Sequence, residues 1–416
     1  MSAVVDTYRD DVNASYAVDF GRDREPSQKR SRHPEYRRSG GAPTRVGGMH
    51  NRRSKRWTWG SGRGARMLNM RAFASCVAFA VMSLSTVVFG VTIDYTPVGN
   101  PGNAANGATG WGAVSDVFKI SKYETTNNQY IEFLNKVDAA GTNPNGVYNA
   151  LMGSDVTGGI IFTSTASAGS KYSVKPGAPA GTPAATSYGT MPVLFTSWFS
   201  AARFSNWLQN GQVTGTASME TGAYTLNGQT SGAIPARNAG ATNYLPSRDE
   251  WYKAGFYNGA GATYTMYPTN STTTPTNTIT NVTLANVANY GAAATPTISP
   301  INVDAYTNST SYYGALSMFG NATEYTDTAG TGANAGRPQV FSGSWATVLA
   351  DAGLWSKTGA AIFRNSNITT SQIGFRVAAA VPEPATIALA SVGIGALAGL
   401  DWMKRRKKKA LARIAG

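Results

Sequence analysis

The chain of 416 residues contains one cysteine and two histidines. All three lie near its start, as Cys76, His33 and His50. From residue 92 onward there is no thiol and no imidazole. This absence excludes disulfides, a thiol nucleophile, a histidine general base and soft metal ligands from the larger part of the chain. Chemistry in that part has to depend on carboxylates, hydroxyls, amides and backbone oxygens.

Charged residues are also scarce, at 14% of the sequence, although the formal net charge is +14. Such a basic protein would ordinarily suggest a nucleic-acid partner. The positive excess, however, lies at the two ends. Residues 1–66 carry 15 Lys and Arg against 7 Asp and Glu, and residues 382–416 carry 7 against 2. Residues 92–381 carry 13 of each kind. We therefore expect no nucleic-acid-binding surface on the region between the tails.

An apolar segment, Ala72–Val91, follows the basic residues Arg66 and Arg71. A basic stretch, an apolar run and small residues near its end are typical of a secretory signal peptide. We assign residues 67–91 to such a signal peptide, with a signal anchor as the alternative.

The leader that precedes this segment, residues 1–66, is rich in Arg, Ser and Gly and poor in aliphatic residues. This composition predicts disorder. Because a signal peptide begins at the N-terminus of its precursor, we expect translation to start at Met67 or Met70. The basic leader would then be a mis-assigned start.

The last 36 residues have a distinct order of parts. Val381-Pro382-Glu383-Pro384 precedes an apolar run, Ala385–Leu400, and six basic residues follow at 404–409. As a helix the apolar run would be about 24 Å long, and a bilayer core needs roughly 20 residues. Extended by Trp402 and Met403, the segment predicts membrane contact through residues 385–403, with the basic cluster on the cytoplasmic side.

This order resembles the PEP-CTERM sorting signal of Gram-negative bacteria. The resemblance implies that an exosortase recognises Pro382-Glu383-Pro384 and cleaves nearby. It also implies delivery to the outer surface or extracellular matrix after transient anchoring in the inner membrane. The alternative is an ordinary tail anchor that contains the tripeptide by chance. On the first interpretation, residues 381–416 form a sorting signal with a transmembrane helix and a basic tail.

Residues 92–380 are long enough to form one large core. The apolar spacing predicts three helices, at 124–136, at 197–209 and from 247 onward. Thr126, Ser197 and Ser247 are suitable N-caps, and Ser247 forms a capping box with Glu250. Residues 139–190 and 258–284 are predicted to be mainly loop and coil.

Two further elements are predicted in this region: a hairpin around Gly159–Thr163, and a half-buried strand at Gly374–Ala378, where apolar and polar residues alternate. Trp198 and Trp207 recur at helical spacing, so we expect both in the core rather than in a ligand site.

Five segments of this region, in order, resemble the motifs of the formylglycine-generating enzyme family, whose domain is also called the sulfatase-modifying factor domain. They are Val117–Leu134, Met191–Leu208, Tyr244–Trp251, Tyr313–Tyr325, and Ser342–Trp345 together with Gly374–Arg376. The resemblance implies an irregular α+β single domain, related to C-type lectins, over residues 92–380. The apolar segments described above add hydrophobic helices at the ends of the chain.

The family's reaction converts a sulfatase cysteine to formylglycine with copper and a pair of cysteines. In this chain those cysteines would follow Trp345, and no cysteine is present there. Serine and asparagine lack the softness of a thiolate towards Cu(I). The related iron-dependent sulfoxide synthases need a histidine cluster, which is also missing. We therefore expect no copper, iron or haem and no formylglycine-generating activity.

The family resemblance also implies calcium as a cofactor, because calcium prefers carbonyl and carboxylate oxygens. The matching residues are Gly320 and Ala322, through their backbone oxygens, and Glu324, through its side chain. Asn289 would belong to a second site. In the alternative interpretation Glu324 is a buried carboxylate with its own partners and Gly320 begins a tight turn.

Trp345 and Trp355 are the aromatic residues that we expect at a ligand-binding surface. The capping role explains the paired carboxylates Asp249 and Glu250 without catalysis. We predict an exported, non-catalytic protein, rich in Asn, Thr and Ser, whose partners are exosortase, the membrane and exopolysaccharide. The alternatives are a calcium-dependent, lectin-like carbohydrate-binding module, and an enzyme that acts through carboxylates such as Asp327 or Glu324.

Overall fold

The computed structural model describes residues 90–179, 186–291, 299–348, 356–357, 359 and 361–381. They all belong to one of the two compact units into which the chain divides, residues 85–416. The predicted leader, most of the signal peptide, the sorting signal after Val381, and Trp355 lie outside the described residues. Within the described ranges, no helix combines the length and apolar character needed to cross a bilayer.

Five α-helices are present among these residues: α1 (Asn127–Val137), α2 (Leu151–Ser154), α3 (Trp198–Gln209), α4 (Ala217–Glu220) and α5 (Arg248–Phe256). The three longer ones begin directly after the predicted N-caps, although α1 starts at Asn127 and not at residue 124, where the predicted helical segment began. The side chains of Thr126, Ser197 and Ser247 accept hydrogen bonds from the first turn of α1, α3 and α5. Such caps satisfy backbone N–H groups that have no partner within the helix. Short 3₁₀ turns lie at Pro144–Gly146, Tyr188–Thr190 and Gly332–Asn334.

Two four-stranded sheets form the centre of the domain. The first has the order β1-β2-β14-β5, with bounds Tyr95–Val98, Phe118–Ser121, Ala378–Ala380 and Asn243–Tyr244. The second has the order β12-β11-β10-β13, with bounds Ile362–Phe363, Pro338–Phe341, Thr323–Ala329 and Ile373–Gly374. Neighbouring strands of the first sheet are antiparallel. In the second, β10 and β13 are parallel and the other neighbours are antiparallel.

Three two-stranded ribbons complete the described strands. They are β3 with β4 (Ile160–Phe162, Tyr172–Val174), β6 with β7 (Tyr257–Asn258, Thr263–Tyr264) and β8 with β9 (Thr276–Asn277, Val287–Ala288). The β3–β4 pair is antiparallel, which confirms the hairpin expected near residue 160. Helix α2 and the short strands β6 to β8 occupy stretches that we expected to be mainly loop or coil.

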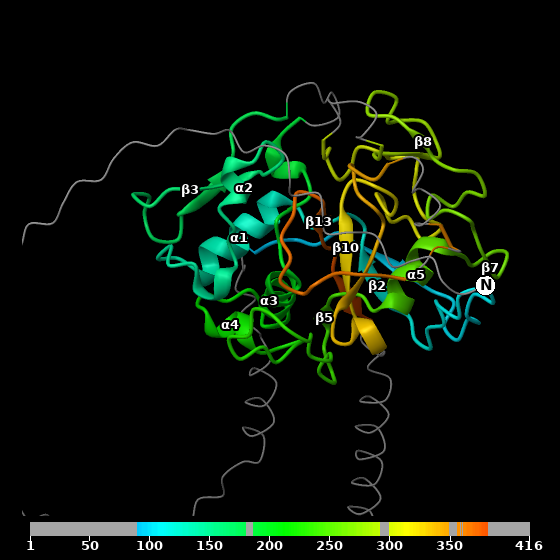
Figure 1. The fold of residues 1–416 in the computed structure, drawn as a ribbon, viewed down its shortest axis with the longest axis horizontal. Coiled ribbons are helices and arrows are strands. Elements are labelled where there is room, and N and C mark those ends of the chain that lie inside the picture. The colour runs from blue at the N-terminus through cyan, green and yellow to red at the C-terminus, as the bar shows by residue number, and fades with distance from the viewer. Residues whose placement is uncertain are drawn as a thin grey trace, which may run out of the picture. The chain divides into compact units, whose positions relative to one another are not determined.

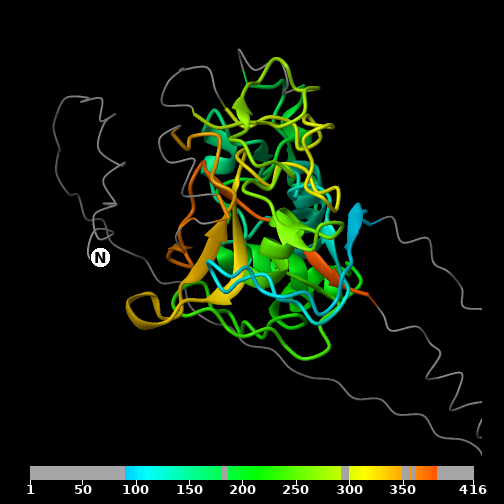
Figure 2. The same cartoon turned by 90° about the vertical axis from the view of Figure 1, so that its right-hand side faces the viewer.

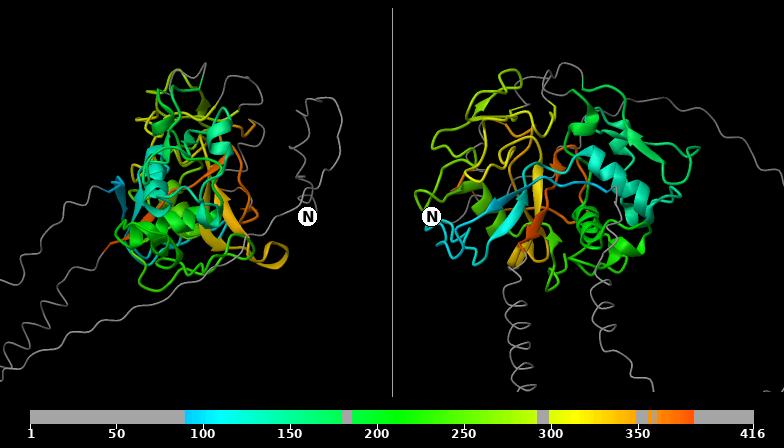
Figure 3. Two further views of the ribbon diagram at one scale, coloured as in Figure 1. Left: turned by 90° about the vertical axis from the view of Figure 1, so that its left-hand side faces the viewer. Right: turned by 180° about the vertical axis from the view of Figure 1, so that it is seen from behind.

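Helices α1 to α4 lie on one side of β10, and α5 lies on the other (Figure 1). The view from behind shows the same division (Figure 3). The largest hydrophobic cluster fills the α1–α3 side, and a second cluster lies around α5. Trp198 and Trp207 are fully buried on α3, as predicted. Phe204, also on α3, contacts Phe133 of α1 and Phe375 at ring-centroid distances of 5.6 and 5.4 Å.

The expected strand at residues 374–378 is wrong. Strand β13 ends at Gly374 and β14 begins at Ala378, so the segment connects two different sheets. Phe375, Arg376 and Val377 are all fully buried, whereas alternation predicted that one face would be exposed. The polar residue is buried because it has a buried carboxylate partner, which a period-of-two pattern cannot reveal.

Lys253 of α5 is fully buried, and its Nζ donates a hydrogen bond to Asn100 O at 2.8 Å. Burial lowers the pKa of Lys253 to about 8, below the usual 10.5. Between these values the unfolded chain binds more protons than the folded one, so this residue makes stability rise with pH. Below about pH 8 the lysine is charged in both the folded and the unfolded chain, so the whole cost of burying its charge lowers the free energy of unfolding.

We expect Lys253→Met to increase the free energy of unfolding at pH 7, as urea titration would show. The gain should shrink as pH rises from about 8 to 10.5. Lys136→Met is the matched control, since the Lys136 side chain is 38% exposed. A Lys253→Met gain that does not change with pH would contradict the account.

Candidate functional site

Residues from several of the sequence motifs meet in one buried group, which we call the carboxylate–arginine cluster. Its members are Glu124 before α1, Trp251 of α5, Asn321 in the turn before β10, Glu324 of β10, and Arg376 between β13 and β14. Each of these five residues is at most 1% exposed. Motifs up to 255 residues apart in sequence are therefore joined at one point of the core.

Arg376 and Glu324 form a two-pronged ion pair at the centre of this cluster. Arg376 Nε and Nη2 each donate to a different oxygen of Glu324, both at 2.6 Å. The indole N–H of Trp251 donates to Glu324 Oε2, also at 2.6 Å. Other guanidinium N–H groups donate to the backbone oxygens of Ser121 and Leu316. Such complete pairing is what allows a charged pair to be stable in the core.

Glu124 is the second carboxylate of the cluster. Its Oε1 accepts from the backbone N–H of Ala322 at 2.9 Å, and its Oε2 accepts from Asn321 Nδ2 at 2.8 Å. Burial raises the pKa of Glu124 well above its usual range, and the negative charge of Glu324 raises it further, while Arg376 opposes both. The guanidinium of Arg376 thus donates hydrogen bonds to Glu324 and lowers the pKa of Glu124 through its charge. Asn321 holds the Glu124 side chain in place by a hydrogen bond.

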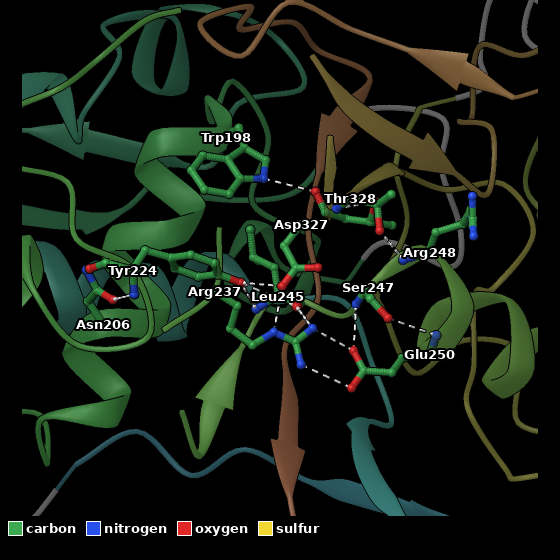
Figure 4. Close-up of polar contacts among 11 residues, drawn as sticks. Trp198, Asn206, Tyr224, Arg237, Leu245, Ser247, Arg248, Glu250, Asp327 and Thr328 are labelled. Atoms are coloured by element: carbon green, nitrogen blue, oxygen red, sulfur yellow. Dashed lines mark hydrogen bonds and ion pairs between the residues drawn. The ribbon is translucent and has the colours of Figure 1, made fainter. Parts of the chain in front are cut away.

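A second group of polar side chains, which we call the Arg237 cluster, lies between α3 and α5 (Figure 4). Arg237 donates from Nε to Asp327 Oδ2 at 2.7 Å and from Nη2 to Glu250 Oε2 at 2.7 Å. Tyr224 donates its hydroxyl proton to Asp327 Oδ2 at 3.1 Å. The guanidinium carbon lies 3.7 Å from the centroid of the Tyr244 ring.

The secondary structure around the Arg237 cluster explains its geometry. Glu250 is fixed by its capping box, in which its Oε2 accepts from the backbone N–H of Ser247 at 2.6 Å (Figure 4). Strand β10 carries Asp327 and is attached to α3 by the hydrogen bond from the Trp198 indole to Thr326 O. Burial raises the pKa of Asp327, and the charge and hydrogen bonds of Arg237 offset part of the effect.

In both clusters the carboxylates that were candidates for catalysis have arginine partners. The oxygens of Glu324 and Asp327 described above are paired with arginine, and their side chains are 0% and 5% exposed. General acid–base catalysis instead needs a carboxyl group within reach of a substrate proton.

A cavity of about 370 Å³ is lined by Gly90, Val91, Asn128, Gln129 and Glu132, which belong to neither cluster.

A smaller cavity of about 20 Å³ includes Glu124 in its lining. Its volume suits about one water molecule. Its other lining residues are Ile93, Asp94, Ser121, Tyr123, Thr125, Thr126 and Gln129.

The sequence matches two models of known protein families. Residues 101–381 match the model described as the sulfatase-modifying factor enzyme 1-like domain. The chain belongs to this family. Residues 380–408 match the PEP-CTERM protein-sorting motif, as expected from the C-terminal sequence. No curated protein matches the chain at the threshold used for relatives.

The sulfatase-modifying factor-like domain also resembles solved structures at low identity. Treponema denticola variable protein 1 is 15% identical, with a TM-score of 0.42, over 69% of this chain and 95% of that one. CarF is 20% identical, with a TM-score of 0.43, over 70% and 99%. PvdO from Pseudomonas aeruginosa is 13% identical, with a TM-score of 0.36, over 70% and 93%.

The residues predicted to bind calcium in this domain lie close together but have different surroundings. The oxygens of Glu324 already accept from Arg376 and Trp251. Asn289 is fully buried, and its Oδ1 has no hydrogen-bond partner in the part of the chain that the structure describes. Its backbone oxygen accepts from Asn321 N, and Gly320 O accepts from the Ser342 hydroxyl.

An unpaired buried oxygen suits a hard cation. Of the four residues, Asn289 is therefore the one whose geometry favours calcium, whereas Glu324 fits the alternative interpretation of a carboxylate with its own partners. Among the described residues, no group of three or more His, Cys, Asp and Glu side chains could hold a metal ion. Calcium binding stays a prediction.

Of the two tryptophans predicted to bind ligand, the structure describes only Trp345. It is partly exposed, and its indole N–H donates to Ser371 O at 2.7 Å. This bond fixes the ring orientation. Ligand binding by Trp345 stays a prediction.

Sequence reasoning did not single out Arg237 or Tyr224. Their partners are up to 103 residues away in sequence, and neither residue lies in a motif segment. One signal was available: residues 92–381 contain only 13 Lys and Arg, so each arginine of this region is a candidate partner for a buried carboxylate.

Proposed function

We propose that this protein is an exported, non-catalytic member of the sulfatase-modifying factor-like family, with a structural or binding role at the outer surface or in the extracellular matrix. The PEP-CTERM motif indicates export to the cell envelope of a Gram-negative bacterium and marks the chain as a substrate of exosortase. The finer location and the non-catalytic role are the proposed part.

The observation that carries the proposal is the absence of thiol and imidazole from residues 92–416 of a chain with this family domain. The family's copper chemistry, as the resemblance implies it, needs thiolate ligands. Glu324 is paired with Arg376 and Asp327 with Arg237. These pairs support a structural role, because breaking a buried ion pair strongly destabilises a fold.

The composition of the domain supports a place in a polysaccharide matrix. Residues 92–381 carry equal numbers of cations and carboxylates, and their surface segments are rich in Asn, Thr and Ser. A charge-balanced surface with many hydroxyl and amide groups can exchange hydrogen bonds with sugars without attracting nucleic acid.

A direct assay can test the non-catalytic part of the proposal. The purified protein would be incubated with copper and a cysteine-containing sulfatase peptide, and the peptide would then be analysed by mass spectrometry and by an aldehyde-reactive probe. We expect unmodified peptide, while an active copper-dependent formylglycine-generating enzyme serves as the positive control. Aldehyde formation above the protein-free background would overturn the proposal.

A further inference from the structure

The last described strand, β14, ends one residue before the sorting motif. Ala378–Ala380 form the strand, Val381 follows, and Pro382-Glu383-Pro384 comes next. β14 is an inner strand of its sheet, antiparallel to β2 on one side and to β5 on the other. Figure 2 shows this strand in red-orange, in the sheet whose far strand β1 is blue, with β2 between the two. Its backbone groups are therefore engaged on both edges, as when Ala380 N donates to Thr242 O at 3.1 Å.

The stretch of chain that an enzyme could bind between β14 and the apolar run is short. Four residues, 381–384, separate β14 from the apolar run that begins at Ala385. Fully extended, they span about 13 Å. Proteins that recognise short linear motifs commonly bind several residues in extended form through backbone hydrogen bonds. Such a segment around Pro382-Glu383-Pro384 would include residues that the folded sheet already holds.

Side chains contribute little to holding β14 in its sheet, so its place depends mainly on backbone hydrogen bonds to β2 and β5. Its three residues are alanines, whose side chains bury little apolar surface. The segment just before it, Phe375–Val377, buries larger side chains, whereas the buried side chains of Ala378 and Ala379 are single methyl groups. Local opening of a protein involves segments with few buried apolar contacts. Release of Ala378–Ala380 would free the motif and leave the carboxylate–arginine cluster intact.

We propose that β14 acts as a latch on exosortase processing. While β14 is paired with β2 and β5, the folded domain holds the sorting motif too close for the enzyme to bind. Exosortase therefore acts on chains in which β14 is unpaired. This inference rests on the proposed function, because it takes the chain to be an exosortase substrate with its apolar run in the membrane.

The test uses the full-length chain in its producing bacterium, with pulse–chase labelling to follow loss of the C-terminal segment. Eight Gly/Ser residues inserted between Ala380 and Val381 add roughly 16 Å of mean reach. We expect the processing half-time to fall several-fold. The same insert after Gly261, in an exposed turn, is the control and should leave the half-time unchanged.

A second variant separates reach from strand pairing. Ala379→Gly weakens β14 without lengthening the chain, because glycine is unfavourable inside a strand. We expect faster processing here too. An unchanged half-time for both variants would overturn the latch, and a faster insert with an unchanged Ala379→Gly variant would also overturn it, since reach alone would then set the rate.

Failure of the proposed function would look different. Glu383→Ala and a strain without exosortase should both abolish processing of the wild-type chain and of the insert variant. Processing that continues unchanged in these two cases would show that the chain is not an exosortase substrate. Processing that depends on exosortase but is indifferent to β14 would overturn the latch alone.

Discussion

Replacing Arg376 by methionine is expected to lower the free energy of unfolding by about 3–5 kcal/mol, the usual cost of removing one partner from a buried ion pair. Arg376 is fully buried and holds both oxygens of Glu324 at 2.6 Å. Its loss would leave Glu324 without its ion-pair partner and would remove a positive charge that lowers the pKa of Glu124. Urea unfolding of the purified protein, followed by tryptophan fluorescence, measures the change.

Two further variants make this prediction specific. Arg337→Met also removes one arginine, but Arg337 is exposed, and the expected change is within about 0.5 kcal/mol. The double variant Glu324→Gln with Arg376→Met removes both charges and should be more stable than Arg376→Met alone. If Arg376→Met and Arg337→Met had equal effects, the carboxylate–arginine cluster would not be what stabilises the core.

Gly320→Ala is the second substitution with a large expected effect. Gly320 has φ of +82°, and a Cβ there would lie 2.2 Å from Asn289 O. That backbone oxygen cannot move away easily, because it accepts from Asn321 N at 2.8 Å. We expect a loss of at least about 3 kcal/mol, well above the usual effect of a point substitution.

Gly102→Ala separates the steric clash from the backbone strain. Gly102 has φ of +74°, and no atom lies within 4 Å of the position its Cβ would take. The strain of a left-handed residue alone costs roughly 1–2 kcal/mol. Equal losses at positions 102 and 320 would show that the turn before β10 adapts, and that its close contact with Asn289 is not a requirement of the fold.

The sequence predicted those parts of the fold that local chemistry determines. Thr126, Ser197 and Ser247 begin their helices because each cap acts within one turn of the chain. The α+β class and the domain family followed from motifs that were matched in order. The strand predicted at 374–378 was wrong, because the burial of Arg376 depends on a carboxylate 52 residues away.

The candidate site was harder to predict for the same reason. Glu124 and Glu324 are recognisable as motif residues, but their joint dependence on Arg376 appears only when three distant segments come together. Arg237 illustrates the limit more sharply, since its carboxylate partners are 13 and 90 residues away. Spacing rules describe neighbours on one helix or strand, and contacts of this kind lie between elements.

The intact mass of the exported protein is the measurement that tests the central claim most directly. Protein would be collected from the surface and medium of the producing bacterium and of a strain without exosortase. The account predicts that the wild-type product ends near Pro382-Glu383-Pro384 and has lost the apolar run and Lys404–Lys409, whereas the exosortase-free strain retains the full C-terminus in its membranes. Identical C-termini and identical locations in the two strains would contradict it.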